Sequence, residues 1–173
     1  MTIQSRVVTA FILGMCLALT SAHAQTSFAA STIQKEALMT KRSSGPFDVK
    51  VSPLTAYNQD DQALGRFSLD KQFHGELEGT SKGEMLGFGN GAKGSSGGYV
   101  AIEKVTGTLN GHSGTFVLQH NTTMTRGTPQ MNIIVVPDSG TGELTGLAGK
   151  MNIVIAPDGK HSYEFDYTLP ETH

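Results

Sequence analysis

The chain has 173 residues, a formal net charge of −2 and one cysteine, Cys16. This length suffices for one domain with a sizeable core, and the charge leaves neither a basic stripe for nucleic acid nor a lysine–arginine cluster for an anionic membrane. A single cysteine excludes an internal disulfide. The chain has no P-loop and no GxGxxG motif after a strand, so we expect no nucleotide cofactor and no other cofactor.

Residues 1–24 have the three parts of a secretory signal peptide. Arg6 precedes the apolar run VVTAFILGMCLALT at residues 7–20, and Ala22-His23-Ala24 forms an A-x-A cleavage site. The run is shorter than the about 20 apolar residues that span a bilayer. We therefore expect cleavage after Ala24, export to the periplasm or the medium, and no membrane attachment afterwards. Lipidation at Cys16 is the less favoured alternative, because the apolar run before it is short.

Residues 25–45 are predicted to form a linker, with a short helix after Ser31 as its one candidate element. From Pro46 onward, apolar and polar residues alternate, as they do in half-buried strands. Eight strand candidates follow, each bounded by Gly, Pro, Asn or Asp. They lie around residues 47–51, 67–73 and 84–88, and at residues 99–109, 114–125, 129–137, 150–156 and 161–169.

The strand pattern predicts an all-β fold, a single eight-stranded antiparallel closed barrel over residues 46–170. Many of the 21 glycines lie inside strand patterns, where they allow a sheet to curl, and closure removes exposed sheet edges. The motif T-G-x-L-x-G-x-x-G occurs at residues 106–114 and again at 141–149. We interpret it as a reused turn whose glycines adopt positive φ and whose leucine packs into a barrel end. A glycine nest that binds anions is the alternative interpretation.

The second copy of this motif, GTGELTGLAG followed by KMNIVIA, resembles a turn before a strand in allene oxide cyclases and dirigent proteins. Leu144 stands where those turns have an aromatic residue. Residues 46–169 are more closely similar to the bacterial DUF3224 family. The matching stretches are LGRFSLDKQFHGELEGTSKGEML, GSSGGYVAIEKVTGTLNGHSGTFVLQHNTTMTRG, VVPDSGTGELTGLAGKMNI and DGKHSYEFDYTLP.

The resemblance implies a barrel of the allene oxide cyclase type, similar in shape to calycins and lipocalins. It also implies, by analogy, that the protein can form a homo-oligomer. It supplies no activity and no catalytic residues, because the DUF3224 family has no assigned function and fold alone does not determine function.

Two residues are candidates for proton transfer. Glu103 shares a strand face with Tyr99, Ala101 and Val105, so an inward orientation would place a carboxylate in a poorly solvated lumen. The alternative is an exterior glutamate paired with a lysine or arginine of a neighbouring strand. His120 shares its strand face with apolar residues and is either a catalytic group or a hydrogen-bonded core histidine.

Side chains that could shape a ligand site include aromatic rings and one amide. The candidates are Phe67, Phe73, Tyr99, Gln119, Tyr163 and Tyr167. Gln119 and His120 are adjacent in a strand and therefore point to opposite faces. His74 and Glu76 share one strand face but have no evident third ligand, so we expect no metal site.

Three functions remain open on this evidence. We favour an exported barrel that binds a small apolar molecule, since a small barrel of about eight strands has room for one ligand. The first alternative is a cofactor-free isomerase or cyclase that acts on an apolar substrate with Glu103 and His120. The second is an oligomeric structural protein whose barrel is filled by its own side chains.

Overall fold

The computed structural model describes residues 39–58 and 64–171. The predicted signal peptide, its cleavage site and the helix expected after Ser31 lie outside the described residues. The chain divides into residues 1–35 and 36–173, and the described residues all belong to the second unit. Within the described residues, no helix is long and apolar enough to cross a membrane.

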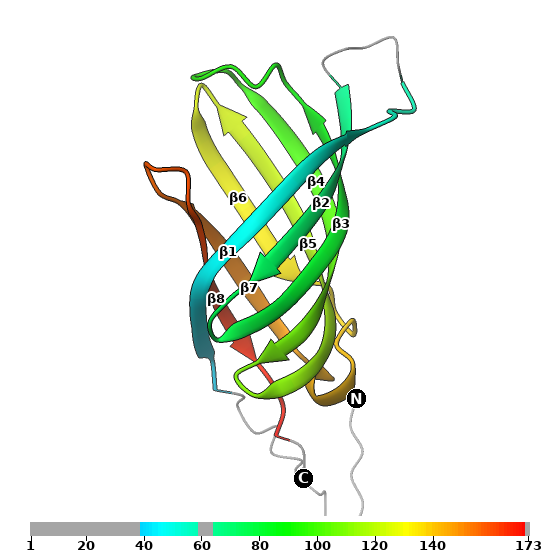
Figure 1. The fold of residues 1–173 in the computed structure, drawn as a ribbon, viewed down its shortest axis with the longest axis vertical. Helices are drawn as coiled ribbons and strands as arrows, with labels where there is room; N and C mark the ends of the chain where they lie inside the picture. The colour runs from blue at the N-terminus through cyan, green and yellow to red at the C-terminus, as the bar shows by residue number, and fades with distance from the viewer. Residues whose placement is uncertain (1–38, 59–63, 172–173) are drawn as a thin grey trace, which may run out of the picture. The chain divides into compact units, whose positions relative to one another are not determined.

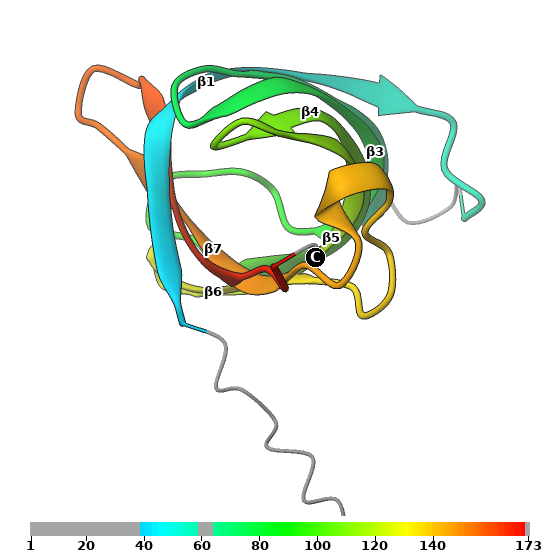
Figure 2. The same ribbon diagram turned by 90° about the horizontal axis from the view of Figure 1, so that it is seen from below.

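The described residues form a closed antiparallel barrel of eight strands in sequence order, which confirms the predicted fold class (Figures 1 and 2). The strands are β1 (Lys41–Leu54), β2 (Leu64–Phe73), β3 (Leu77–Phe88), β4 (Gly97–Leu109), β5 (His112–Thr125), β6 (Thr128–Val135), β7 (Ala148–Ile155) and β8 (His161–Thr168). One 3₁₀ helix, η1 (Gly142–Leu144), lies between β6 and β7. The pairing of β1 with β8 closes the barrel.

Strand β1 begins before the boundary that the sequence predicts. Lys41 pairs with Tyr167 of β8, so residues 41–45 belong to the barrel and not to a linker. These residues have no apolar alternation, and only their pairing with β8 makes them a strand. Gly45 fits here because a side chain at this position would collide with the backbone of His74.

The two copies of the glycine motif adopt different local structures, so the interpretation as one reused turn is wrong. The first copy forms the β4–β5 hairpin, with Asn110 and Gly111 at φ 47° and 88°. The second copy contains η1, and positive φ is adopted by Gly142, the first residue of η1, and by Gly146 beyond its end. The expectation for the leucines is confirmed, because Leu109 and Leu144 are both fully buried.

The barrel has two unlike ends. The β4–β5 turn and η1 lie at one end, which we call the plugged end, at the bottom of Figure 1. The β3–β4 loop and the β5–β6 turn lie at the other, which we call the open end. Close to the plugged end, stacked aromatic rings fill the interior, with Phe165 5.3 Å from Tyr167 and 5.9 Å from Phe116 between ring centroids. Leu144 of η1 belongs to this core. In the view from below, η1 lies at this end of the barrel (Figure 2).

Candidate functional site

The inward-facing side chains change from buried to exposed along the strands toward the open end. On β1, Phe47 is 4% exposed and Val51 is 48% exposed. On β7, Met151 is 1% exposed and Ile155 is 60% exposed. These residues are separated by even numbers of positions and share the inner face, so the difference reflects an interior that is filled at one end and hollow at the other.

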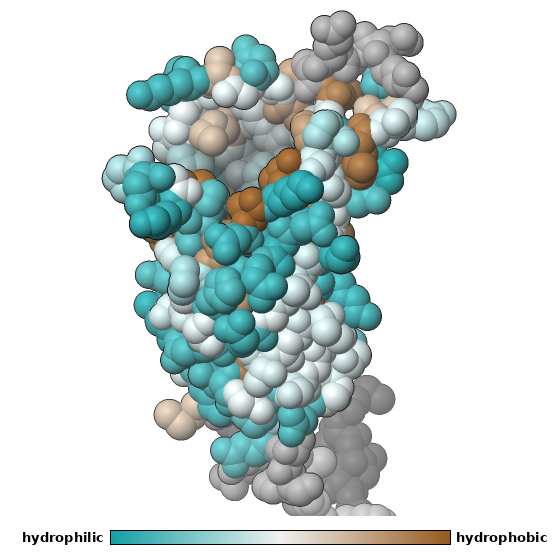
Figure 3. All heavy atoms as spheres, in the orientation of Figure 1, coloured by the Kyte–Doolittle hydropathy of each residue, from teal (hydrophilic) through white to brown (hydrophobic). Residues whose placement is uncertain are grey.

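The hollow contains a cavity of about 170 Å³, which we call the lumen cavity. Its walls are apolar and its polar groups are few, a composition typical of small-molecule sites. The lining residues are Phe47, Val49, Val51, Leu69, Lys71, Met85, Tyr99, His120, Met131, Ile153, Ile155 and His161. In the space-filling view the surface is hollowed near the open end, and hydrophobic residues are visible in the hollow (Figure 3).

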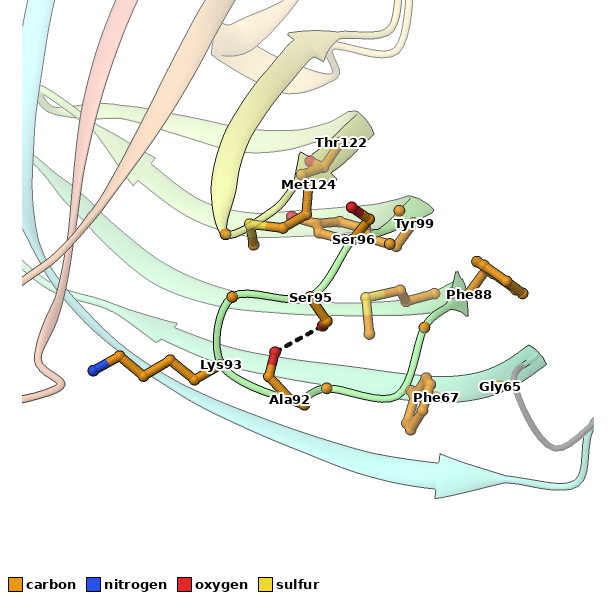
Figure 4. Close-up of a pocket in the computed structure, with 18 residues that line it drawn as sticks. Gly65, Phe67, Phe88, Ala92, Lys93, Ser95, Ser96, Tyr99, Thr122 and Met124 are labelled. Carbon is orange, nitrogen blue, oxygen red and sulfur yellow. Dashed lines mark hydrogen bonds between the residues drawn. The ribbon is translucent and has the colours of Figure 1, made fainter.

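A second hollow of about 550 Å³, the mouth cavity, lies beneath the β3–β4 loop. It shares Met85 and Tyr99 with the lumen cavity, so the two adjoin. Figure 4 shows the loop passing across the labelled side chains of Phe67, Tyr99 and Met124. The loop is held to the β5–β6 turn because the amide of Gly127 donates a hydrogen bond of 3.0 Å to the carbonyl of Ser95.

The barrel wall is weakest between β6 and β7. These strands pair only at Ile133–Met151 and Ile134–Lys150, whereas the other neighbours pair over most of their length. Toward the open end β6 and β7 separate (Figure 1). Met131 of β6 and Ile153 of β7 both line the lumen cavity, which therefore lies beside this unpaired seam.

A buried ionic cluster lies below the lumen cavity. Glu103 is fully buried. Its Oε1 accepts a hydrogen bond of 2.6 Å from Lys71 Nζ and lies 2.7 Å from His120 Nε2. Its Oε2 accepts a hydrogen bond of 2.6 Å from the Ser81 hydroxyl. Lys71 and His120 both reach the lumen cavity, while Glu103 lies behind them and does not line it. The cluster is thus an anchored carboxylate with two basic groups that face the lumen cavity.

The register of the strands explains how residues from β2 and β4 meet across β3. Gly83 of β3 pairs with Leu69 of β2 on one side and with Glu103 of β4 on the other. A side chain at Gly83 would collide with Glu103. The missing side chain leaves room for the carboxylate, which lets Lys71 contact it over β3.

Glu103 is held as a carboxylate. Burial by itself would raise its pKa, but the hydrogen bond with His120 and the positive charge of Lys71 outweigh burial and lower the pKa from 4.5 to about 2. A group with so low a pKa is a poor general base near neutral pH. Glu103 is therefore placed to orient His120 and to neutralise Lys71, and it does not fit the acid–base role expected for it.

His120 faces the lumen cavity. Its Nε2 contacts Glu103, and within the described residues no hydrogen bond is found for its Nδ1. The imidazole ring lies 6.4 Å from the ring of Tyr99 between centroids. A carboxylate on one ring nitrogen fixes the orientation of the ring and leaves the other nitrogen for hydrogen bonding or proton transfer.

The structure separates the predicted ligand-binding residues into three groups. Phe67 lines the mouth cavity, and Tyr99 lines both cavities. Gln119 is exposed on the outer face of β5, away from the lumen, as strand alternation with His120 requires. Its assignment to the ligand site is not consistent with this placement.

Phe73, Tyr163 and Tyr167 belong to the filled core and do not line either cavity. The phenol oxygen of Tyr163 accepts a hydrogen bond of 2.7 Å from the amide of Leu77, and that of Tyr167 accepts one of 2.9 Å from Asn110. These phenols tie turns of the plugged end to β8. Their role is structural, as is usual for buried tyrosines whose hydroxyls find a partner.

Two members of the cluster, Lys71 and Ser81, were not among the predicted site residues. Lys71 stands between Leu69 and Phe73 in the alternating pattern of its strand. A lysine on an otherwise apolar strand face could therefore have been predicted as an inward-facing candidate. Ser81 had no comparable signal, since glycines and polar residues surround it in sequence. Its inward orientation follows only from its pairing with Lys71.

His74 and Glu76 do not converge on a common position. The imidazole of His74 lies 3.6 Å from Asp48 and 3.4 Å from Glu78, while Glu76 accepts a hydrogen bond of 2.7 Å from the amide of Ser44. Among residues 39–58 and 64–171, no group of three or more His, Cys, Asp or Glu side chains is arranged to hold a metal ion.

These features define a class of protein: a closed eight-stranded antiparallel barrel, plugged at one end, with a buried ionic cluster below an open apolar cavity. A family model described as a protein of unknown function, DUF3224, matches residues 43–167. The chain therefore belongs to the DUF3224 family, as its sequence indicates.

A solved structure supports this assignment. The crystal structure of a protein with unknown function from the DUF3224 family of Shewanella oneidensis MR-1 is 48% identical and superposes with a TM-score of 0.71. The match covers 78% of this chain and all of that chain, 100%. No curated protein matches this sequence.

Proposed function

We propose that this barrel binds a small, mainly apolar molecule in the lumen cavity and the adjoining mouth cavity. The observation that supports this proposal is the exposure of inward-facing apolar side chains at the open end, such as Val51 and Ile155. Exposed apolar surface in a concavity is unfavourable in water and is covered when a ligand binds. A filled structural barrel would have these side chains buried, as Met151 and Phe165 are near the plugged end.

Native mass spectrometry of the protein purified gently from its own host tests this function. We expect an additional mass that persists under native conditions and is lost on denaturation. The matched control is Met131→Trp, which places a large side chain in the lumen cavity, and we expect it to be purified without the additional mass. An additional mass retained by this variant would place the ligand elsewhere and would contradict the proposal.

A second candidate function, cofactor-free isomerisation or cyclisation of an apolar substrate, is supported by the contact of 2.7 Å between Glu103 and His120. In this mechanism Glu103 orients the imidazole, and the ring transfers a proton to or from the substrate in the lumen cavity. The structure leaves Glu103 itself no contact with the cavity. If this function holds, the unmodified protein converts the bound molecule and His120→Gln does not, whereas a simple binding protein leaves the molecule unchanged in both forms.

We also propose that the protein is exported and acts in the periplasm or the medium, on the basis of the apolar run at residues 7–20 and the A-x-A site. Fractionation of the host cells, followed by mass measurement of the intact protein, tests this. We expect a chain that begins at Gln25 outside the cytoplasm. A full-length chain in the cytoplasm would contradict export.

A further inference from the structure

Lysine and histidine side chains line the two cavities. The lumen cavity is lined by Lys71, His120 and His161, and the mouth cavity by Lys93. Among the described residues that line either cavity there is no aspartate or glutamate. Glu103 balances the charge of Lys71 from behind, so the lining presents N–H donors and no carboxylate to a ligand, which favours an anionic ligand over a cationic one.

The basic groups of the cluster have unused hydrogen-bonding capacity. Lys71 Nζ has three N–H donors, and in the described part of the chain its one hydrogen bond is to Glu103. Its remaining environment is aromatic, with Nζ 5.3 Å from the ring centroid of Phe47 and 5.8 Å from that of Phe73. An acceptor oxygen from a ligand would therefore complete a group that the protein satisfies only in part.

Glu103 cannot be the group that satisfies a polar ligand. Its two oxygens already contact three partners from β2, β3 and β5, and the side chain is fully buried. A ligand head group at the floor of the lumen cavity meets Lys71 and His120 first. Around this floor the walls are aliphatic, with Val49, Leu69 and Ile153 as contacts for a hydrocarbon body.

A second polar position lies in the mouth cavity. The hydroxyl of Thr122 is buried and has no hydrogen-bond partner within the described part of the chain, and the residue is 4% exposed. Thr122 lines the mouth cavity near Tyr99 (Figure 4). A buried hydroxyl without a partner is unusual in a folded protein and is satisfied by a ligand that offers a polar atom at this depth.

We propose that the ligand is an amphipathic organic acid, whose negatively charged oxygen group binds Lys71 and His120 and whose apolar body lies against the walls of the two cavities. This inference rests on the proposed function and adds the chemical class of the ligand. Charge-assisted hydrogen bonds to Lys71 supply the head-group specificity. Burial of the ligand's apolar body adds affinity that does not depend on the head group.

The test compares probes that share one hydrocarbon tail and differ in head group. Octanoate, 1-octanol and octyltrimethylammonium are titrated into the purified protein by isothermal calorimetry. The charged probes are kept below their micelle concentrations, and 1-octanol is kept below its solubility in water. We expect octanoate to bind at least about tenfold more tightly than 1-octanol, which corresponds to about 1.4 kcal/mol. The cationic probe is expected to bind most weakly. Octane-1-sulfonate carries the same charge on a sulfonate in place of a carboxylate, and we expect it to bind about as tightly as octanoate.

The matched variant is Lys71→Met/Glu103→Gln, which removes both charges of the ion pair together and so leaves no unpaired charge in the barrel. We expect it to bind 1-octanol as the unmodified protein does and to lose the preference for octanoate. The control is Lys82→Met, which removes an exposed lysine on the outer face and should leave the preference unchanged.

The possible results distinguish the two proposals. Equal or tighter binding of 1-octanol overturns the acid ligand and leaves the apolar binding function standing. A preference for octanoate that persists in the double variant overturns the role of Lys71. The binding function itself is overturned if none of the probes binds and native mass spectrometry finds the protein without an additional mass.

Discussion

At the scale of single residues, the most informative group is the buried carboxylate of Glu103. It exchanges the solvation of water for contacts with Lys71, His120 and Ser81. Removal of one member of a buried ion pair leaves the other charge unpaired in a medium of low dielectric, which costs more than the pair itself contributes. Substitutions in this cluster therefore lower the stability of the barrel more than substitutions in its surface ion pairs do.

Glu103→Gln is expected to lower the free energy of unfolding by about 3 kcal/mol, because Lys71 remains buried without a counter-charge. Chemical denaturation measures this change. The control is Glu84→Gln, which breaks an exposed pair with Arg66 at 2.6 Å and should change stability by less than about 1 kcal/mol. Similar effects of the two substitutions would show that the buried pair has no special role in stability.

The low pKa of Glu103 predicts an acid dependence of stability. The folded-state pKa of about 2 lies below the ordinary value of 4.5, so the carboxylate stabilises the fold above pH 4.5 and loses this contribution as the pH falls toward 2. We expect the free energy of unfolding to decline in this window by up to roughly 3 kcal/mol from this group. In Glu103→Gln the decline should be correspondingly smaller, and equal slopes in both proteins would contradict the assignment.

At the scale of elements, η1 and the β6–β7 seam divide the barrel into a closed and an open half. Leu144 of η1 is fully buried in the core. The amide of Thr141 donates a hydrogen bond of 2.8 Å to the carbonyl of Thr115, which fixes the segment to β5. In contrast, β6 and β7 pair at two positions and leave the wall open toward the other end.

Leu144→Ala is expected to lower the free energy of unfolding by about 2–5 kcal/mol, since it removes a fully buried leucine and leaves a cavity. Binding of octanoate should be retained, because Leu144 does not line either cavity. Leu86→Ala, on an exposed outer position, is the control and should have little effect on stability. Thermal unfolding with and without octanoate checks both expectations.

At the scale of the whole molecule, the barrel combines a packed core with a hollow in one continuous interior. A larger side chain should therefore lower stability in the packed core and leave it unchanged in the hollow. Met131→Trp adds volume beside the hollow and should abolish ligand binding without loss of stability. Leu118→Trp adds volume to the filled region, where overpacking costs about 1–3 kcal/mol. Destabilisation by both substitutions to the same extent would show that the hollow is not available space.

The sequence by itself determined the β-barrel class and the number of strands, because alternation of apolar residues and the positions of glycine are local signals. The family followed from the resemblance of long stretches of the sequence to DUF3224. It also placed Glu103 and His120 among candidate site residues, since each interrupts an apolar strand face. Self-association, implied by the resemblance, stays a prediction.

Only the tertiary structure decided which candidates share a site. Tyr163 and Tyr167 have the same alternation as Tyr99, yet they lie in the filled core, because a position along the barrel axis follows from strand register and not from local pattern. Register also brought Lys71 of β2 to Glu103 of β4 across Gly83. That contact joins residues 32 positions apart in sequence, and the physical reason that they meet is that β2 and β4 pair with opposite edges of β3.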